Sequence, residues 1–153
     1  MRITPILFSL VFVLGLSCSS SKGTPTASAV TSKNETQQTL ENSKWVLSTL
    51  NGATVEGKLK EGQQIYFTLD VETHRISGNA GCNTFTGRYT IEEGYRIQFS
   101  ELATTEMMCL KSKINESQIL AVFNTAQNYT LNANVLTLSV GKRAPLATFN
   151  LSH

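Results

Sequence analysis

The sequence predicts a mainly β fold of the α+β class: a curved antiparallel sheet or small open barrel of about eight strands, with one amphipathic helix packed on it. Three features of the sequence support this prediction. Short runs of residues alternate apolar and polar side chains, as strands with one buried face do. Turn-forming residues separate several of these runs. One later segment repeats its apolar residues with a helical period, and such a helix must pack that side on the sheet.

The expected strands begin at Trp45 and continue towards the end of the chain. They are Trp45–Leu50, Ile65–Asp70, His74–Asn79, Gly87–Ile91, Tyr95–Phe99, Tyr129–Asn132, Val135–Val140 and Pro145–Leu151. Asn51-Gly52 is a strong turn signal, and a short polar link between the second and third runs indicates a hairpin. Glu92-Glu93-Gly94 indicates another hairpin. The residues that alternate with period two are Ile65, Phe67 and Leu69, and later Leu136, Leu138 and Val140.

One segment departs from the strand period. Its apolar residues at positions i, i+3, i+4 and i+7 are Ile119, Val122, Phe123 and Ala126. This spacing puts them on one side of a helix, which we expect to begin near Ser112 and to end near Asn128.

Residues 1–17 have the pattern of a signal peptide. Met1-Arg2 supplies a positive start, and Ile6–Leu16 is apolar except for a serine and a glycine. As a helix this run is roughly 17 Å long, well short of the ~30 Å hydrocarbon core of a bilayer. The run is therefore interpreted as the apolar part of an export signal and not as a membrane span.

The end of this signal resembles a bacterial lipobox. Leu16-Ser17 precedes Cys18, and the resemblance implies cleavage before Cys18 and a diacylglycerol on its sulfur. Gly15 departs from the pattern, because lipoboxes usually carry leucine there. The alternative is an ordinary secretory signal followed by a chance cysteine; both interpretations predict export. Ser19 after the cysteine resembles lipoproteins sent to the outer membrane, so that membrane is favoured over the inner one.

Residues 18–40 are expected to form a lipidated N-terminus and a flexible tether, because they are rich in Ser, Thr and Gln and carry too few large apolar side chains to pack. Residues 41–153 remain as one domain. The formal net charge is +2, with 13 basic and 11 acidic residues. These charges are scattered, so no nucleic-acid partner is expected.

Catalytic and metal sites are not expected. A nucleophilic Cys82 or Cys109 would need an activating histidine, and the two histidines are His74, in a hairpin link, and His153, the last residue. Two cysteines 27 residues apart with one histidine do not form a zinc-binding pattern. No cofactor is expected either: Gly78–Gly81 lacks the context of a phosphate loop and is better explained by a turn or bulge.

Two features around the cysteines each have alternative interpretations. Met107 and Met108 either line a ligand cavity or, as favoured here, pack in the core. Asn83 and Gly87 are expected to fix the turn that positions Cys82. If Cys18 carries lipid, Cys82 and Cys109 are an even pair in an oxidising compartment and can form a disulfide, or else pack as two buried thiols.

Several motifs together resemble the META domain family, which includes the heat-inducible HslJ envelope lipoproteins. The segments are "SGNAGCNTFTGRYT" (77–90), "LATTEMMCLK" (102–111), "NESQILAVF" (115–123) and "YTLNANVLTL" (129–138). Gly81-Cys82-Asn83 and the spacing Thr105-x-Met107-x-Cys109 are the more specific features. The resemblance covers roughly residues 43–150. It implies a single barrel-like domain, a bond between Cys82 and Cys109, no catalytic centre and no cofactor.

Two functions from different classes follow. The first is a non-enzymatic, lipid-anchored envelope protein whose domain is an interaction or stress-related module. The second is a carrier that binds a lipid or another small apolar ligand inside a half-open barrel. A filled interior would favour the first, and a continuous apolar cavity would favour the second. An enzyme is the third interpretation, and it would require a cleft that holds His74 beside a reduced cysteine.

Overall fold

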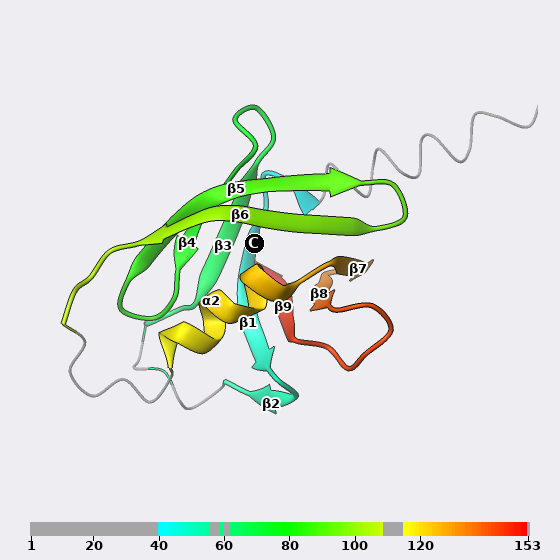
Figure 1. Ribbon diagram of the computed structural model, residues 1–153. Coiled ribbons are helices and arrows are strands. Elements are labelled where there is room, and N and C mark those ends of the chain that lie inside the picture. The colour runs from blue at the N-terminus through cyan, green and yellow to red at the C-terminus, as the bar shows by residue number, and fades with distance from the viewer. Residues whose placement is uncertain (1–39, 56–58, 60–61, 109–114, 153) are drawn as a thin grey trace, which may run out of the picture.

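The computed structural model describes residues 40–55, 59, 62–108 and 115–152 (Figure 1). The expected signal peptide, Cys18, nearly all of the tether and Cys109 lie outside these residues. Within the part described, no helix has both the length and the apolar character needed to cross a membrane.

Nine strands form one antiparallel sheet in the described residues. Their bounds are β1 (Lys44–Leu50), β2 (Ala53–Thr54), β3 (Tyr66–Asp70), β4 (Arg75–Asn79), β5 (Thr84–Glu92), β6 (Arg96–Thr104), β7 (Asn128–Asn132), β8 (Val135–Ser139) and β9 (Ala147–Ser152). The strands follow one another in space in the order β2-β1-β3-β4-β5-β6-β7-β8-β9, and β1 also pairs with β9. The sheet therefore closes into a ring, and the predicted antiparallel barrel with one packed helix is confirmed.

The first strand closes the ring because both of its edges are used. One edge of β1 pairs with β9 from Lys44 to Leu50. The other edge pairs first with β3 and then, at Thr49 and Leu50, with the short β2. The turn from β1 to β2 is Asn51-Gly52, as expected, and both residues have positive φ (49° and 78°). That conformation is typical of a two-residue hairpin turn and favours Asn-Gly.

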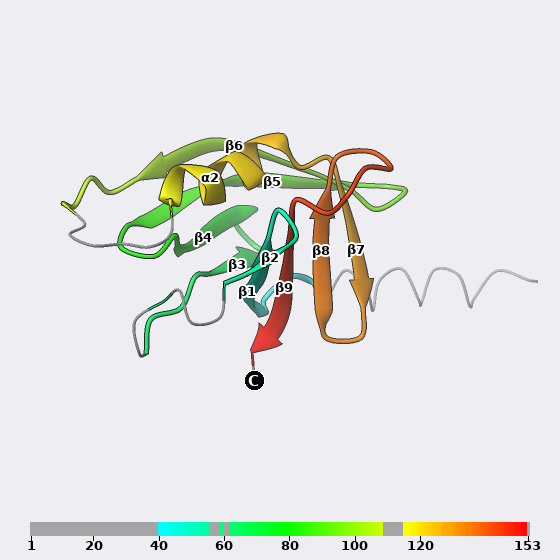
Figure 2. The same ribbon diagram turned by 90° about the horizontal axis from the view of Figure 1, so that it is seen from below.

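The ring is weakest between β6 and β7. In the described strands, Arg96 and Asn128 are the one register pair that joins them. Beyond that point β6 continues to Thr104 paired with β5 on one edge only, and α2 (Glu116–Thr125) lies along it (Figure 2). The helix thus takes the place of a strand along this part of β6.

The helix has the buried face that the sequence predicts. Ile119, Val122, Phe123 and Ala126 are all buried. Asn115 caps the helix, because its side-chain oxygen accepts a hydrogen bond from the Ser117 N–H at 3.0 Å. The predicted start near Ser112 lies outside the described residues. The predicted end near Asn128 is late, because Asn128 already pairs in β7 with Ser139.

Five phenylalanines fill the interior of the barrel. The Phe123 ring lies 5.2 Å from Phe67, 5.0 Å from Phe85 and 5.2 Å from Phe99, between ring centroids. Phe149 lies 6.2 Å from Phe123 and 4.9 Å from Phe67. These side chains come from α2, β3, β5, β6 and β9, so one aromatic cluster joins the helix to strands around the ring. Aromatic contacts of this kind contribute beyond the area they bury.

The residues before β1 also pack into the core. Leu40 is fully buried, and its carbonyl accepts a hydrogen bond from the Trp45 indole N–H at 2.9 Å. The buried Glu41 carboxylate accepts a hydrogen bond from the Tyr89 hydroxyl, and that hydroxyl also lies 3.1 Å from the Asp70 carbonyl oxygen. Burial raises the pKa of Tyr89, and both the hydrogen bond to Glu41 and the negative charge of Glu41 raise it further. Tyr89 therefore remains a neutral donor at physiological pH.

Two strands are longer than predicted, and the reason is a β-bulge. β5 begins at Thr84, and β6 continues to Thr104, past a register shift opposite Gly87. Glu101, at this shift, has φ of 52°. A Cβ on Gly87 would lie 2.7 Å from the Leu102 side chain, so glycine is needed for this close approach. The expectation that Gly87 fixes the turn around Cys82 is therefore wrong: it accommodates the bulge.

Candidate functional site

The turn that carries Cys82 joins β4 to β5. The Asn79 side-chain oxygen accepts the Gly81 N–H at 2.8 Å, and the Ala80 N–H donates to the Asn83 carbonyl oxygen at 2.8 Å. Gly81 has φ of 129°, which favours glycine. The structure thus places Cys82 in a tight turn between two strands, as the sequence predicts.

Asn83 ties this turn to the residues that follow β6. Its side-chain oxygen accepts hydrogen bonds from the Thr105 hydroxyl at 2.9 Å and from the Met107 N–H at 2.8 Å. Thr84 and Thr105 are also joined, because the Thr105 N–H donates to the Thr84 carbonyl oxygen at 3.0 Å. The two segments that resemble the META motifs therefore lie side by side.

A carboxylate on the helix completes the cluster. One oxygen of Glu116, in the first turn of α2, accepts the N–H groups of Cys82 and Asn83, the latter at 2.8 Å. The other oxygen accepts the Asn83 side-chain N–H at 2.7 Å. We call Cys82, Asn83, Thr105, Met107 and Glu116 the polar clamp. Sequence analysis missed Glu116, although an acidic residue directly after a capping asparagine is a recognisable sign of a helix start.

The hydrogen bonds of the polar clamp stabilise the ionised carboxylate. Partial burial of Glu116 disfavours its charge, but the side-chain and backbone N–H groups of Asn83 and the N–H of Cys82 outweigh this effect. The pKa of Glu116 is therefore lowered from its ordinary value near 4.5. A carboxylate that already accepts three hydrogen bonds is a poor general base, so the clamp is suited to holding three segments together.

Replacing Glu116 by glutamine is expected to lower the free energy of unfolding at pH 7 by about 1–3 kcal/mol, because it weakens these charge-assisted hydrogen bonds. A lowered folded-state pKa gives stability that is present above the unfolded pKa and is lost as pH falls through the folded pKa. The difference between parent and variant should therefore be largest near neutral pH and shrink below about pH 4.5. Urea unfolding of the parent and the variant at pH 7 and at pH 4 measures this difference.

The matched control is Glu106→Gln, because Glu106 is an exposed carboxylate beside the same motif. It should change stability by less than about 0.5 kcal/mol at either pH. A Glu116→Gln penalty that is the same at pH 7 and pH 4 would contradict the assigned role of the carboxylate charge.

The structure separates His74 from Cys82. His74 lies in the link before β4, and the turn with Cys82 follows that strand, so the two residues are at opposite ends of β4. The His74 ring instead contacts Tyr89, with 5.9 Å between ring centroids. Among the described residues, no group of three or more His, Cys, Asp or Glu could hold a metal ion.

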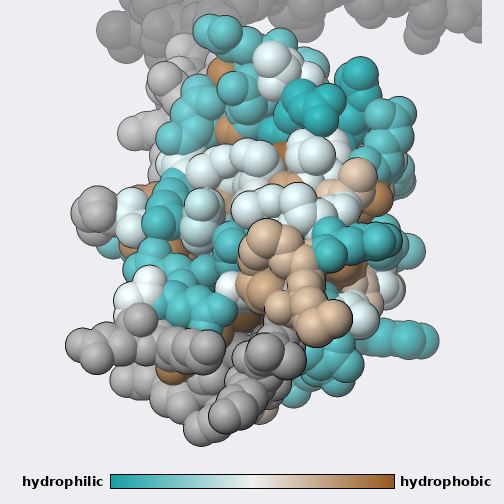
Figure 3. Space-filling model, turned by 90° about the vertical axis from the view of Figure 1, so that its left-hand side faces the viewer, coloured by the Kyte–Doolittle hydropathy of each residue, from teal (hydrophilic) through white to brown (hydrophobic). Residues whose placement is uncertain are grey.

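The two methionines after β6 do not pack in the core. Met107 is 60% exposed and Met108 is 89% exposed, so the favoured core interpretation is wrong. The reason is that the backbone of Met107 is held by Asn83 outside the barrel. Figure 3 views the molecule from the side on which β6 ends and α2 begins, and it shows a pale brown patch on a face coloured mostly teal and white.

The family model of the META domain matches residues 38–153. The chain belongs to the META domain family. The matched range includes the barrel, α2 and every residue of the polar clamp, so the clamp lies within the META domain of this chain.

Solved structures of other proteins have a fold similar to that of this chain. A protein from Burkholderia xenovorans, solved by NMR, is 26% identical, with 77% of this chain and 87% of that chain covered and a TM-score of 0.60. A second protein solved by NMR is 28% identical, with 74% and 92% covered and a TM-score of 0.59. A crystal structure of a DUF4847 family protein from Bacteroides vulgatus is 14% identical, with 75% and 96% covered and a TM-score of 0.52, and shares the fold alone. None of the curated proteins matches the chain.

Proposed function

We propose that this chain is a non-enzymatic, HslJ-like envelope protein, anchored by a lipid on Cys18, whose META domain is an interaction or stress-related module. The observation that carries the proposal is the filled interior of the barrel. Barrels of about eight strands hold either one small ligand or their own side chains. Here Phe123 and the four phenylalanines around it occupy the inside, and Leu40 packs in as well.

A domain with a filled interior must act through its outer surface. The polar clamp supports the same conclusion, because its carboxylate and amide groups bond to one another and to the backbone. Within the described residues, His74 lies at the opposite end of β4 from Cys82, which gives no support to an activated cysteine nucleophile. The scattered charges of the sequence give no support to a nucleic-acid partner.

Native mass spectrometry of the exported protein tests this choice against the carrier. The interaction module predicts the mass of the chain and its anchor alone. An uncharged lipid or another uncharged apolar molecule that remains bound in stoichiometric amount after purification would favour the carrier and overturn the proposal.

Replacing Cys18 by alanine is expected to release the protein from the membrane fraction or to leave an uncleaved precursor, because the acceptor of the lipid is gone. Fractionation of cells and immunoblotting measure the change. Ser21→Ala is the matched control, since it changes a residue close to Cys18 and leaves the lipid acceptor in place. If both variants stay in the membrane to the same extent as the parent, the lipid anchor is the wrong interpretation.

A further inference from the structure

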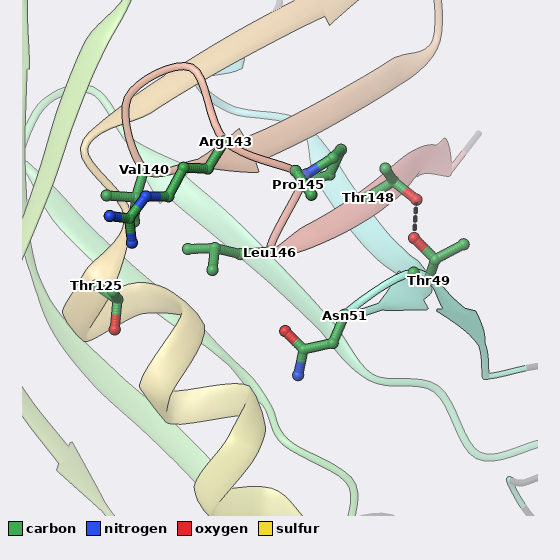
Figure 4. Close-up of a pocket in the computed structure, with 10 residues that line it drawn as sticks. Thr49, Asn51, Thr125, Val140, Arg143, Pro145, Leu146 and Thr148 are labelled. Atoms are coloured by element: carbon green, nitrogen blue, oxygen red, sulfur yellow. Dashed lines mark hydrogen bonds between the residues drawn. The ribbon is translucent and has the colours of Figure 1, made fainter.

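A pocket opens on the outer surface where four segments meet. It has a volume of about 520 Å³ and lies between the end of β1, the end of α2, the β8–β9 loop and β9 (Figure 4). The residues that line it are Thr49, Asn51, Gly52, Thr125, Val140, Arg143, Ala144, Pro145, Leu146 and Thr148. Pockets of this size accommodate small organic molecules. The pocket is separate from the polar clamp, which lies at the other end of α2.

The lining combines an apolar wall with one cation. Val140, Pro145 and Leu146 supply the apolar wall, and Arg143 is the one charged residue among those that line the pocket. Two ion pairs between side chains are found in the described part of the chain, Arg88–Glu101 and Arg96–Glu92, and Arg143 belongs to neither. The guanidinium of Arg143 is therefore available to an anion.

The three threonine hydroxyls that line the pocket already take part in hydrogen bonds within the protein. The hydroxyls of Thr49 and Thr148 lie 2.6 Å apart and bond to each other, and the Thr125 hydroxyl donates to the Ala121 carbonyl oxygen. Figure 4 shows the Leu146 side chain between Asn51 and Arg143. A guanidinium beside an apolar surface suits a ligand with an anionic end and an apolar body.

We propose that this pocket binds a small organic carboxylate with an apolar body. Arg143 pairs with the carboxylate, which its planar guanidinium can bind through two parallel hydrogen bonds. The apolar body lies on Leu146, Val140 and Pro145. This site goes beyond the function proposed above, because it uses the outer surface and leaves the filled interior unchanged.

The test is an NMR titration of the full exported chain, in non-ionic detergent, with 3-phenylpropionate and with the neutral 3-phenylpropionamide. The carboxylate should shift the amide signals of Gly52 and Ala144 saturably and bind about tenfold more tightly than the amide, the gain expected from a charge-assisted pair. Arg143→Gln should weaken carboxylate binding by about tenfold. Lys142→Gln, which removes the neighbouring exposed charge outside the pocket, should change it less than about twofold.

A second variant keeps the charge and fills the space. Ala144 is exposed, so the Ala144→Phe variant should keep the fold intact while it lowers the affinity for the carboxylate. Equal binding of carboxylate and amide, equal losses in Arg143→Gln and Lys142→Gln, or shifts confined to residues away from the pocket would each overturn the proposal.

Discussion

Replacing Phe123 by aspartate is expected to unfold the domain. Phe123 is 1% exposed and lies at the centre of the aromatic cluster that joins α2 to the sheet. Truncating such a residue to alanine costs about 3–5 kcal/mol, and a buried unpaired carboxylate costs more. A loss of that size is comparable with the ~5–15 kcal/mol that stabilises a typical domain.

Circular dichroism and urea unfolding measure this result. The matched control is Gln118→Asp, which introduces the same charge on the exposed side of the same helix. It should change the free energy of unfolding by less than about 0.5 kcal/mol. A Phe123→Asp variant that unfolds cooperatively at the same urea concentration as the parent would show that α2 does not hold the barrel closed.

The second large effect is expected from a disulfide between Cys82 and Cys109. The Met107 N–H donates a hydrogen bond to the side-chain oxygen of Asn83 at 2.8 Å, and Asn83 directly follows Cys82 in the turn. Cys109 is two residues further on, and two residues span at most about 7 Å, so it can reach Cys82. Closing a loop of about 28 residues stabilises a fold by roughly 3.5 kcal/mol in the chain-entropy model. The Cys82→Ser, Cys109→Ser double variant should lose about that amount.

Thiol labelling of the exported protein, denatured but not reduced, tests the bond itself. Neither Cys82 nor Cys109 should react until reductant is added. Reaction of both cysteines without reductant would mean that the bond does not form. The reduced parent is the matched control for the double variant, and it should show the same loss of stability.

Local patterns in the sequence were sufficient for much of the fold. The period-two alternation of Ile65, Phe67 and Leu69 predicts β3, and all three side chains are buried. The helical spacing around Phe123 predicts the buried side of α2 in the same way. These patterns work because one element with one buried face imposes its own period on the sequence.

Features that depend on contacts between distant residues could not be predicted. Glu116 meets the Cys82 turn across more than thirty positions of the sequence, and β1 closes the ring on β9. No local pattern reports such pairings. The exposure of Met108 is missed for a related reason: an apolar side chain normally indicates burial, but here the preceding residue is held outside the barrel by Asn83. The pocket at Arg143 is likewise formed by segments far apart in the sequence.

The proposal that this META domain works through its outer surface is tested most directly by photo-crosslinking in the cell that produces it. A photoreactive phenylalanine analogue would replace, one at a time, Met108, Tyr95 and Val135, which are 89%, 54% and 40% exposed. The proposal predicts a discrete adduct with the same envelope protein from at least one position and a weaker one, or none, from the others. Exported, folded protein that gives no protein adduct from any of the three positions would contradict it.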